Sequence, residues 1–171
     1  MTGARRLCVL VSAVCLAVVS TAVAAEVATV GKPPPPFALR DEEGTVHRLA
    51  AYAGKPTIVY FTHNVCHYCG QVIAFLNRAH QRYADQGLVI LSINVMADGA
   101  ELIRRYKEQF NLTFTMLAGK DPELLRNYEV NYVPILVFID RSGLVYQIHH
   151  HYILPETFDA SVEHIVAGQS H

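Results

Sequence analysis

Two kinds of hydrophobic pattern alternate along the first half of the chain. Residues 57–62 and 88–95 are largely continuous apolar runs, which are typical of strands covered on both faces. Residues 69–84 instead carry apolar positions at helical spacing, and Gly87 follows as a favourable residue beyond a helix end. A strand, a helix and a strand in succession predict a parallel crossover unit.

The second half of the chain continues with shorter elements and ends in a hairpin and a helix. The expected elements are, in order, a helix opened by a capping box at Asp98 and Glu101, a strand at 114–117, a helix at 122–128, strands at 135–139 and 144–152 around a turn at 140–143, and a helix from Pro155. The pattern predicts an α/β fold with a central mixed β-sheet, helices on both faces and a short N-terminal hairpin within residues 37–49.

The N-terminal segment differs in composition from the rest of the chain. Residues 7–25 contain no charged side chain and follow Arg5 and Arg6, which is typical of an export signal. Small residues favour cleavage after Ala24, and an uncleaved membrane anchor is the alternative. We therefore expect a signal peptide at 1–24, a proline-rich linker at 25–36 and one domain at 37–171, in a periplasmic or other extracytoplasmic location.

Overall charge gives no sign of a nucleic-acid partner. The chain of 171 residues has a formal net charge of −1, and no run of lysine or arginine appears in it. Nucleic-acid binding is not expected for this composition.

The cysteines of the chain indicate a single candidate redox site. Cys8 and Cys15 lie in the predicted signal, so only Cys66 and Cys69 remain in the domain. A disulfide that closes so short a loop adds little stability through chain entropy, so a purely structural role is the weaker alternative. The pair is expected to be redox-active.

The Cys66-His67-Tyr68-Cys69 motif lies between a predicted strand and a predicted helix start. At that place backbone N–H groups favour the Cys66 thiolate, so Cys66 is the expected nucleophile and Cys69 the resolving thiol. Haem attachment is excluded because residue 70 is glycine. Zinc binding through the pair with His63, His67 or the histidines at 149–151 stays open as an alternative, although no metal is expected.

The chain resembles the exported thioredoxin-like proteins of the TlpA and ResA type, within the redoxin group, over residues 31–166. The motifs are the proline-rich entry at 31–37, residues 41–44, Gly54-Lys55-Pro56, the Cys-x-x-Cys motif and Val133-Pro134. The resemblance implies a thioredoxin-like fold, a cis bond before Pro134 and substrate docking along Val133. It also implies a thiol-disulfide oxidoreductase that needs no cofactor beyond its own disulfide.

The resemblance further implies binding partners and a direction of electron transfer. Substrates would be thiols or disulfides of exported proteins, including apocytochrome c, and a donor in the membrane would supply electrons to a reductase. The sequence alone leaves the direction of transfer open, since pairs of this kind span about −270 to −120 mV.

Three positions depart from the family pattern. Val65 stands where many relatives have tryptophan, Tyr60 where thioredoxins keep a buried acid, and Val72 where ResA-like reductases often have glutamate. The usual proton acceptor for the second cysteine is therefore missing. His63 or His67 could tune the thiol pKa in its place, although ordinary solvated loop histidines are the simpler interpretation.

Two other functions are weighed against the oxidoreductase. A copper-binding or copper-delivery protein of the Sco type uses Cys-x-x-x-Cys, which is one residue longer than the present motif. A thiol peroxidase of peroxiredoxin type has Thr-x-x-Cys, whereas three residues separate Thr62 from Cys66.

Overall fold

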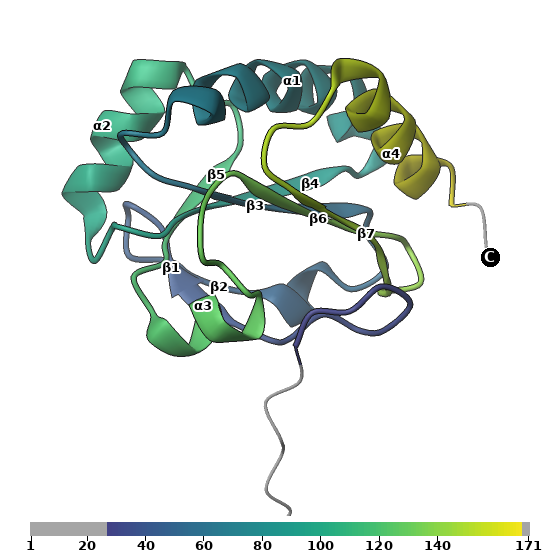
Figure 1. Cartoon of the computed structure of the whole chain (residues 1–171), viewed down its shortest axis with the longest axis horizontal. Coiled ribbons are helices and arrows are strands. Elements are labelled where there is room, and N and C mark those ends of the chain that lie inside the picture. Colours follow the sequence, from purple (N-terminus) through teal and green to yellow (C-terminus); the bar gives the residue numbers. More distant parts are fainter. Residues whose placement is uncertain (1–26, 169–171) are drawn as a thin grey trace, which may run out of the picture.

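The computed structural model describes residues 27–168, which fold around one five-stranded sheet (Figure 1). The strands are β3 (Thr57–Thr62), β4 (Val89–Asn94), β5 (Thr115–Ala118), β6 (Ile135–Ile139) and β7 (Val145–His150). All six residues of β3 and all five of β6 are buried, because layers cover both faces of the sheet.

The strand order is β5-β4-β3-β6-β7, with β3 in the centre. β3 pairs in parallel with β4, and β4 with β5, whereas β6 runs antiparallel to β3 and to β7. The predicted mixed sheet is confirmed. This topology brings the end of β3, the end of β4 and the beginning of β6 to one edge, where the Cys-x-x-Cys and Val133-Pro134 motifs meet.

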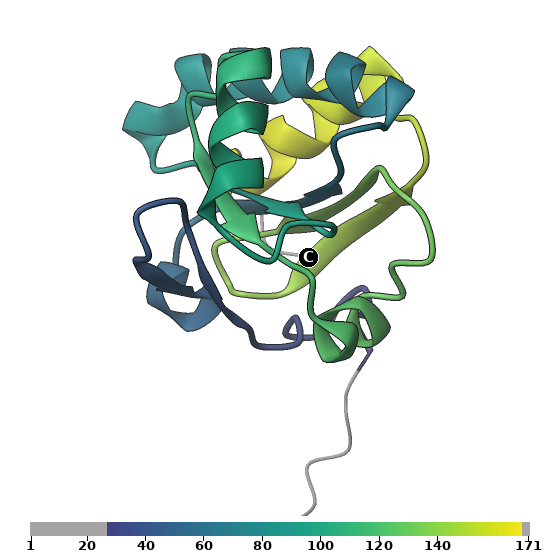
Figure 2. The same ribbon diagram turned by 90° about the vertical axis from the view of Figure 1, so that its left-hand side faces the viewer.

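Three helices cover the upper face of the sheet as drawn in Figures 1 and 2. They are α1 (His67–Tyr83), α2 (Ala100–Phe110) and α4 (Pro155–Ala167). Their apolar sides share one hydrophobic cluster with alternate residues of the strands, for example Tyr60 and Phe138. Because strand side chains alternate between faces, Val59 and Phe61 point into a second cluster below the sheet.

The lower layer consists of β1 (Ala38–Arg40), β2 (Val46–Arg48), the 3-10 helix η1 (Leu49–Tyr52) and α3 (Pro122–Asn127). β1 and β2 form the expected antiparallel hairpin. A second 3-10 helix, η2 (Ala84–Gln86), extends α1, and Gly87 follows it with φ 88°.

The proline-rich segment is packed against the domain. The sequence predicts a linker here, yet Ala28 is buried and its N–H donates to the carbonyl of Asn127. Gly31 and Lys32 exchange backbone hydrogen bonds with Val145. These bonds come from residues far away in the sequence, which local composition does not reveal. The packed domain therefore includes the part of this segment that the structure describes.

The capping box expected at Asp98 and Glu101 is wrong. Helix α2 begins at Ala100 with Gly99 as its N-cap and no side-chain cap. The Asp98 carboxylate lies too far before the first turn, and it pairs with Lys120 instead.

The predicted signal at 1–24 lies outside the described residues. No helix within residues 27–168 is both long enough and apolar enough to cross a bilayer.

Candidate active site

Cys66 and Cys69 form a disulfide at the start of α1, with an S–S distance of 2.04 Å. Cys66 is the N-cap residue of the helix and is partly exposed, whereas Cys69 is fully buried at 0% exposure. The two sulfurs are thus unequal in access. An incoming thiol or disulfide reaches Cys66, and Cys69 is shielded from it.

The helix start provides a hydrogen bond to the Cys66 sulfur. The backbone N–H of Cys69 donates to Cys66 Sγ at 3.2 Å. In the reduced protein this N–H and the 17-residue helix behind it would stabilise a thiolate on Cys66. The geometry agrees with the assignment of Cys66 as the nucleophile, which stays a prediction.

Val133 and Pro134 lie beside the disulfide, and the bond between them is cis. Cys66 Sγ is 3.8 Å from the carbonyl oxygen of Val133. Val133 is partly exposed, and Pro134 is buried and accepts a hydrogen bond from the N–H of His151. The structure therefore brings the second predicted motif to the first, across 67 residues of sequence.

The two histidines considered for pKa tuning make other contacts. His63 Nδ1 accepts a hydrogen bond from the N–H of Val65 at 3.2 Å, which shapes the loop before Cys66. The exposed ring of His67 packs edge-on against Tyr68 at a centroid distance of 5.3 Å. Both lie next to the disulfide in the chain, and their effect on the thiols stays a prediction.

A phenol lies beneath the disulfide where thioredoxins keep an acid. The buried hydroxyl of Tyr60 donates to the carbonyl of Cys69 at 3.1 Å. Burial raises the pKa of Tyr60 well above its ordinary value, and the nearby Tyr106 raises it further. Tyr60 is therefore a neutral hydrogen-bond donor and not a base at physiological pH. The sequence shows that the usual acid is absent at this position, but it does not reveal the hydrogen bond from Tyr60 to the Cys69 carbonyl.

Asn94 is a site residue that the sequence analysis missed. It ends β4, is fully buried and donates to Asn64 Oδ1 at 2.8 Å. Its own Oδ1 accepts from the N–H of Met96 at 3.0 Å. The side-chain amide of Asn94 thus connects the loop that leads to Cys66 with the loop after β4. The sequence feature that could have revealed Asn94 is the presence of this polar residue inside the apolar run 88–95.

The histidines at 149–151, which the sequence offers as zinc ligands, lie at and just beyond the end of β7. His149 lies within β7, whereas His151, expected inside the strand at 144–152, lies beyond it with φ 68° and stacks on Tyr132. Burial lowers the pKa of His149, an effect that its bond to the backbone of Tyr152 opposes. Among residues 27–168, no three His, Cys, Asp or Glu side chains lie close enough together to hold a metal ion.

Solved structures share this architecture. A thiol:disulfide interchange protein, thioredoxin family protein, of Chlorobium tepidum TLS superposes with a TM-score of 0.67 at 22% identity, covering 81% of this chain and 98% of that one. A thiol:disulfide interchange protein of Bacteroides sp. gives a TM-score of 0.71 at 18% identity, covering 82% and 92%. The fold is thioredoxin-like, and it carries a Cys-x-x-Cys disulfide at the start of a helix.

Sequence comparison gives the family. Residues 30–148 match the model of the AhpC/TSA family. The thiol-disulfide oxidoreductase ResA of Geobacillus kaustophilus is 33% identical over 119 residues, which cover 70% of this chain and 68% of the relative. The chain therefore belongs to the AhpC/TSA family and, within it, to the ResA-type thiol-disulfide oxidoreductases. A more distant relative, the chloroplastic peroxiredoxin Q of Sedum lineare, is 24% identical over 139 residues.

Proposed function

We propose that this oxidoreductase reduces disulfides in other proteins outside the cytoplasm, with Cys66 and Cys69 as its redox group. The observation that carries the proposal is the unequal accessibility of the two cysteines. Cys66 is accessible at the helix start, and Cys69 is buried one turn further on. Two thiols carry the two electrons that one disulfide needs, so the proposed reaction requires no added cofactor.

The reaction proceeds in two exchanges. The Cys66 thiolate attacks one sulfur of the substrate disulfide, forms a mixed disulfide and releases the first substrate thiolate, which takes a proton from solvent. The Cys69 thiol then loses its proton and attacks Cys66 Sγ. The second substrate thiolate leaves, and the Cys66–Cys69 disulfide seen in the structure is formed. A dithiol donor must reduce it again.

The surroundings of Cys66 support the reducing direction. A strongly stabilised thiolate stabilises the reduced form and makes such a pair an oxidant. Among the described residues the backbone N–H of Cys69 is the hydrogen-bond donor to Cys66 Sγ, and segments 63–69 and 131–134 contain no lysine or arginine. The reduced form therefore receives limited electrostatic help, which favours its oxidation by substrate disulfides.

The uncharged N-terminal run supports the proposed location. Residues 7–25 after Arg5 and Arg6 have the pattern of an export signal. One solved neighbour, 20% identical with a TM-score of 0.65, is described as a secreted disulfide oxidoreductase of Mycobacterium tuberculosis. Outside the cytosolic thiol pool, a reductase needs a donor that passes electrons through the membrane. Apocytochrome c is one exported substrate that the proposal includes.

Peroxide reduction is the second candidate, because the family model and the distant peroxiredoxin Q relative both favour it. Against it, the hydroxyl of Thr62 is fully buried and lies 2.5 Å from the hydroxyl of Tyr106. That hydroxyl is engaged with Tyr106 in the core, whereas Cys66 is partly exposed.

A redox titration tests the proposed direction. The purified protein is equilibrated with dithiol buffers of graded potential, and the fraction of free Cys66 and Cys69 thiols is measured by alkylation. We expect a midpoint near the thioredoxin value of about −270 mV. A midpoint near the value of about −120 mV for strong oxidants would contradict the reductase. Consumption of hydrogen peroxide faster than reduction of insulin disulfides would favour the peroxidase.

A further inference from the structure

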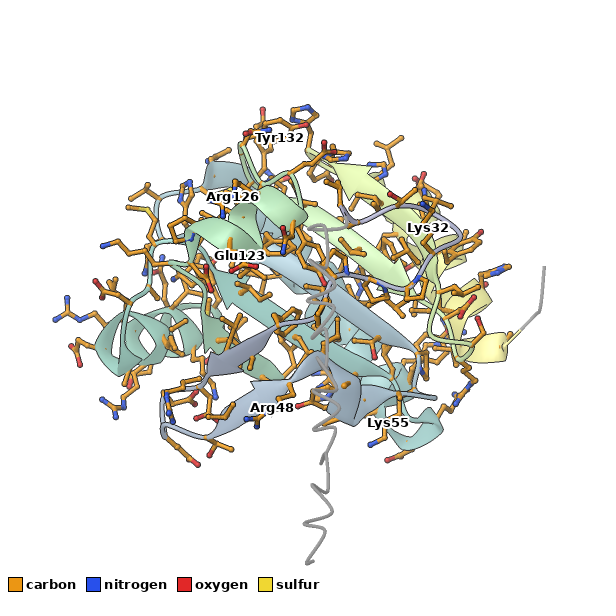
Figure 3. The ribbon with its side chains drawn as sticks, turned by 90° about the horizontal axis from the view of Figure 1, so that it is seen from below. Lys32, Arg48, Lys55, Glu123, Arg126 and Tyr132 are labelled. Atoms are coloured by element: carbon orange, nitrogen blue, oxygen red, sulfur yellow. A yellow bond between two sulfur atoms is a disulfide. The ribbon has the colours of Figure 1, made fainter. Side chains whose placement is uncertain are left out.

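The lower side of the domain carries unpaired positive charge. Residues 27–40 and 46–55 contain four lysines and arginines and no aspartate or glutamate, whereas the hairpin turn between them contains Asp41, Glu42 and Glu43. Lys32, Arg48 and Lys55 are exposed on this side (Figure 3), and none of them belongs to an ion pair among the described residues. We call these three side chains the basic lower face.

Other charges on the same side partly offset this positive charge. Arg126 and Glu123 also appear there (Figure 3), and as neighbours on α3 they contribute opposite charges. Arg40 directs its guanidinium to the carbonyl of Gly44. In the hairpin, Asp41 pairs with His47 and Glu42 with Lys107. Glu43, Asp121 and Glu129 are exposed in this layer as well and offset part of the positive charge, but none of them forms an ion pair with Lys32, Arg48 or Lys55.

An apolar cavity opens beside this charge. It has a volume of about 180 Å³ and is lined mainly by apolar residues, among them Pro34, Pro36, Leu49 and Ile139, together with Lys55. Thr57, the first residue of β3, also lines it, so the cavity lies at the opposite end of that strand from the disulfide. An apolar cavity next to an unpaired ammonium group suits an amphiphile with an anionic head and a hydrocarbon chain.

The chain enters the domain on this same side. The first described residues, from Val27, run along the lower side of the sheet (Figures 1 and 2). Before them come 26 residues, of which 7–25 carry no charge and approach the length of a bilayer span. In the alternative in which this leader stays uncleaved as an anchor, the bilayer that holds it would face the basic lower face.

We propose that the basic lower face binds anionic phospholipids of a membrane surface, with headgroups at Lys32, Arg48 and Lys55 and acyl carbons of the lipid next to Lys55 in the cavity. The domain then rests on the membrane by its lower layer. Cys66, at the start of α1 in the upper layer, faces away from the membrane and remains open to substrates. This proposal concerns a second surface and holds whichever direction the disulfide chemistry takes.

The expected strength follows from the number of cations. Each lysine or arginine near an anionic surface raises affinity about fivefold, so three of them contribute on the order of 100-fold at low salt. The contribution falls as salt rises, because screening shortens the range of exposed charges.

The test uses the full chain reconstituted in lipid nanodiscs and hydrogen exchange read by mass spectrometry. Discs of phosphatidylcholine are compared with discs that contain phosphatidylglycerol. We expect slower exchange in peptides covering 32–40 and 48–57 only with phosphatidylglycerol, with loss of this protection at high salt. Exchange in the segment around Cys66 should be the same in both discs.

Two triple variants control for total charge. The combination Lys32→Gln, Arg48→Gln and Lys55→Gln should abolish the protection. The combination Arg78→Gln, Arg82→Gln and Arg105→Gln, which removes the same charge from α1 and α2, should leave it unchanged. Equal exchange in the two lipids, or protection that survives the first triple variant, would overturn the proposal. Protection by soluble glycerol phosphate in phosphatidylcholine discs would also overturn it, by reassigning the face to small anions.

Discussion

The hydroxyl of Tyr60 donates a hydrogen bond to the backbone carbonyl of Cys69 at 3.1 Å. The bond joins the central strand of the sheet to the first turn of α1. It holds the buried cysteine from below through its backbone, where a thioredoxin would place a carboxylate. Tyr60 thus positions the redox pair without exchanging a proton with it.

Replacing Tyr60 by phenylalanine tests this positioning role. Tyr60→Phe removes one buried hydrogen bond and should lower the free energy of unfolding by about 1 kcal/mol. It should also speed alkylation of Cys69 in the reduced protein, because the helix start loosens. Tyr106→Phe is the control: its hydroxyl bonds Thr62, so it should lose comparable stability and leave Cys69 alkylation unchanged. Equal alkylation rates in both variants would count against the role of Tyr60.

Asn94 should matter more than an ordinary strand residue. Asn94→Ala leaves the N–H of Met96 without its acceptor and frees Asn64, so we expect a loss of about 1 to 3 kcal/mol in unfolding free energy. Amide exchange of Val65 and Cys66 should increase at the same time. Ser92→Ala, in the same buried strand, removes a hydroxyl without a hydrogen-bond partner and should change neither quantity. A Ser92 effect as large as that of Asn94 would refute this account.

Stability should decrease as the pH falls below about 6.5. Burial lowers the pKa of both His80 and His149 below the ordinary value of 6.5. The unfolded chain then binds protons more readily than the folded chain, so the contribution to stability is complete above pH 6.5 and is lost as pH falls through the folded-state pKa values. Urea midpoints at several pH values measure the effect. The double variant His80→Gln, His149→Gln should flatten the dependence, and an unchanged slope would contradict it.

His67 should have little influence on the Cys66 thiolate. Its described contact is with the ring of Tyr68, and the N–H of Cys69 is the group that bonds Cys66 Sγ. The thiolate absorbance of reduced His67→Ala should therefore titrate with the wild-type pKa. A higher Cys66 pKa in this variant would instead assign His67 a tuning role.

Much of the fold could be predicted from the sequence because the strands are covered on both faces. The apolar run at 57–62 matches β3 (Thr57–Thr62) to the residue, and the Cys-x-x-Cys motif lies at the predicted junction of strand and helix. Such signals are local, since each depends on neighbouring residues in the chain.

Long-range contacts could not be predicted in this way. The hydroxyl of Tyr128 bonds the carbonyl of Pro35, 93 residues earlier, and so helps to fix the proline-rich segment. Asn94 acts through Asn64, on another strand-end loop. His151 leaves the predicted strand because its ring stacks on Tyr132. In each case a distant partner decides the conformation.

The central claim is the division of roles between the two cysteines, and trapping of mixed disulfides tests it most directly. Cys66→Ser and Cys69→Ser variants are reduced and incubated with a disulfide-bonded protein, and covalent complexes are counted on non-reducing gels. Cys69→Ser should accumulate the complex, because Cys66 attacks and nothing resolves the product, whereas Cys66→Ser should form almost none since Cys69 is fully buried. Equal trapping by the two variants, or trapping by Cys66→Ser alone, would contradict the account.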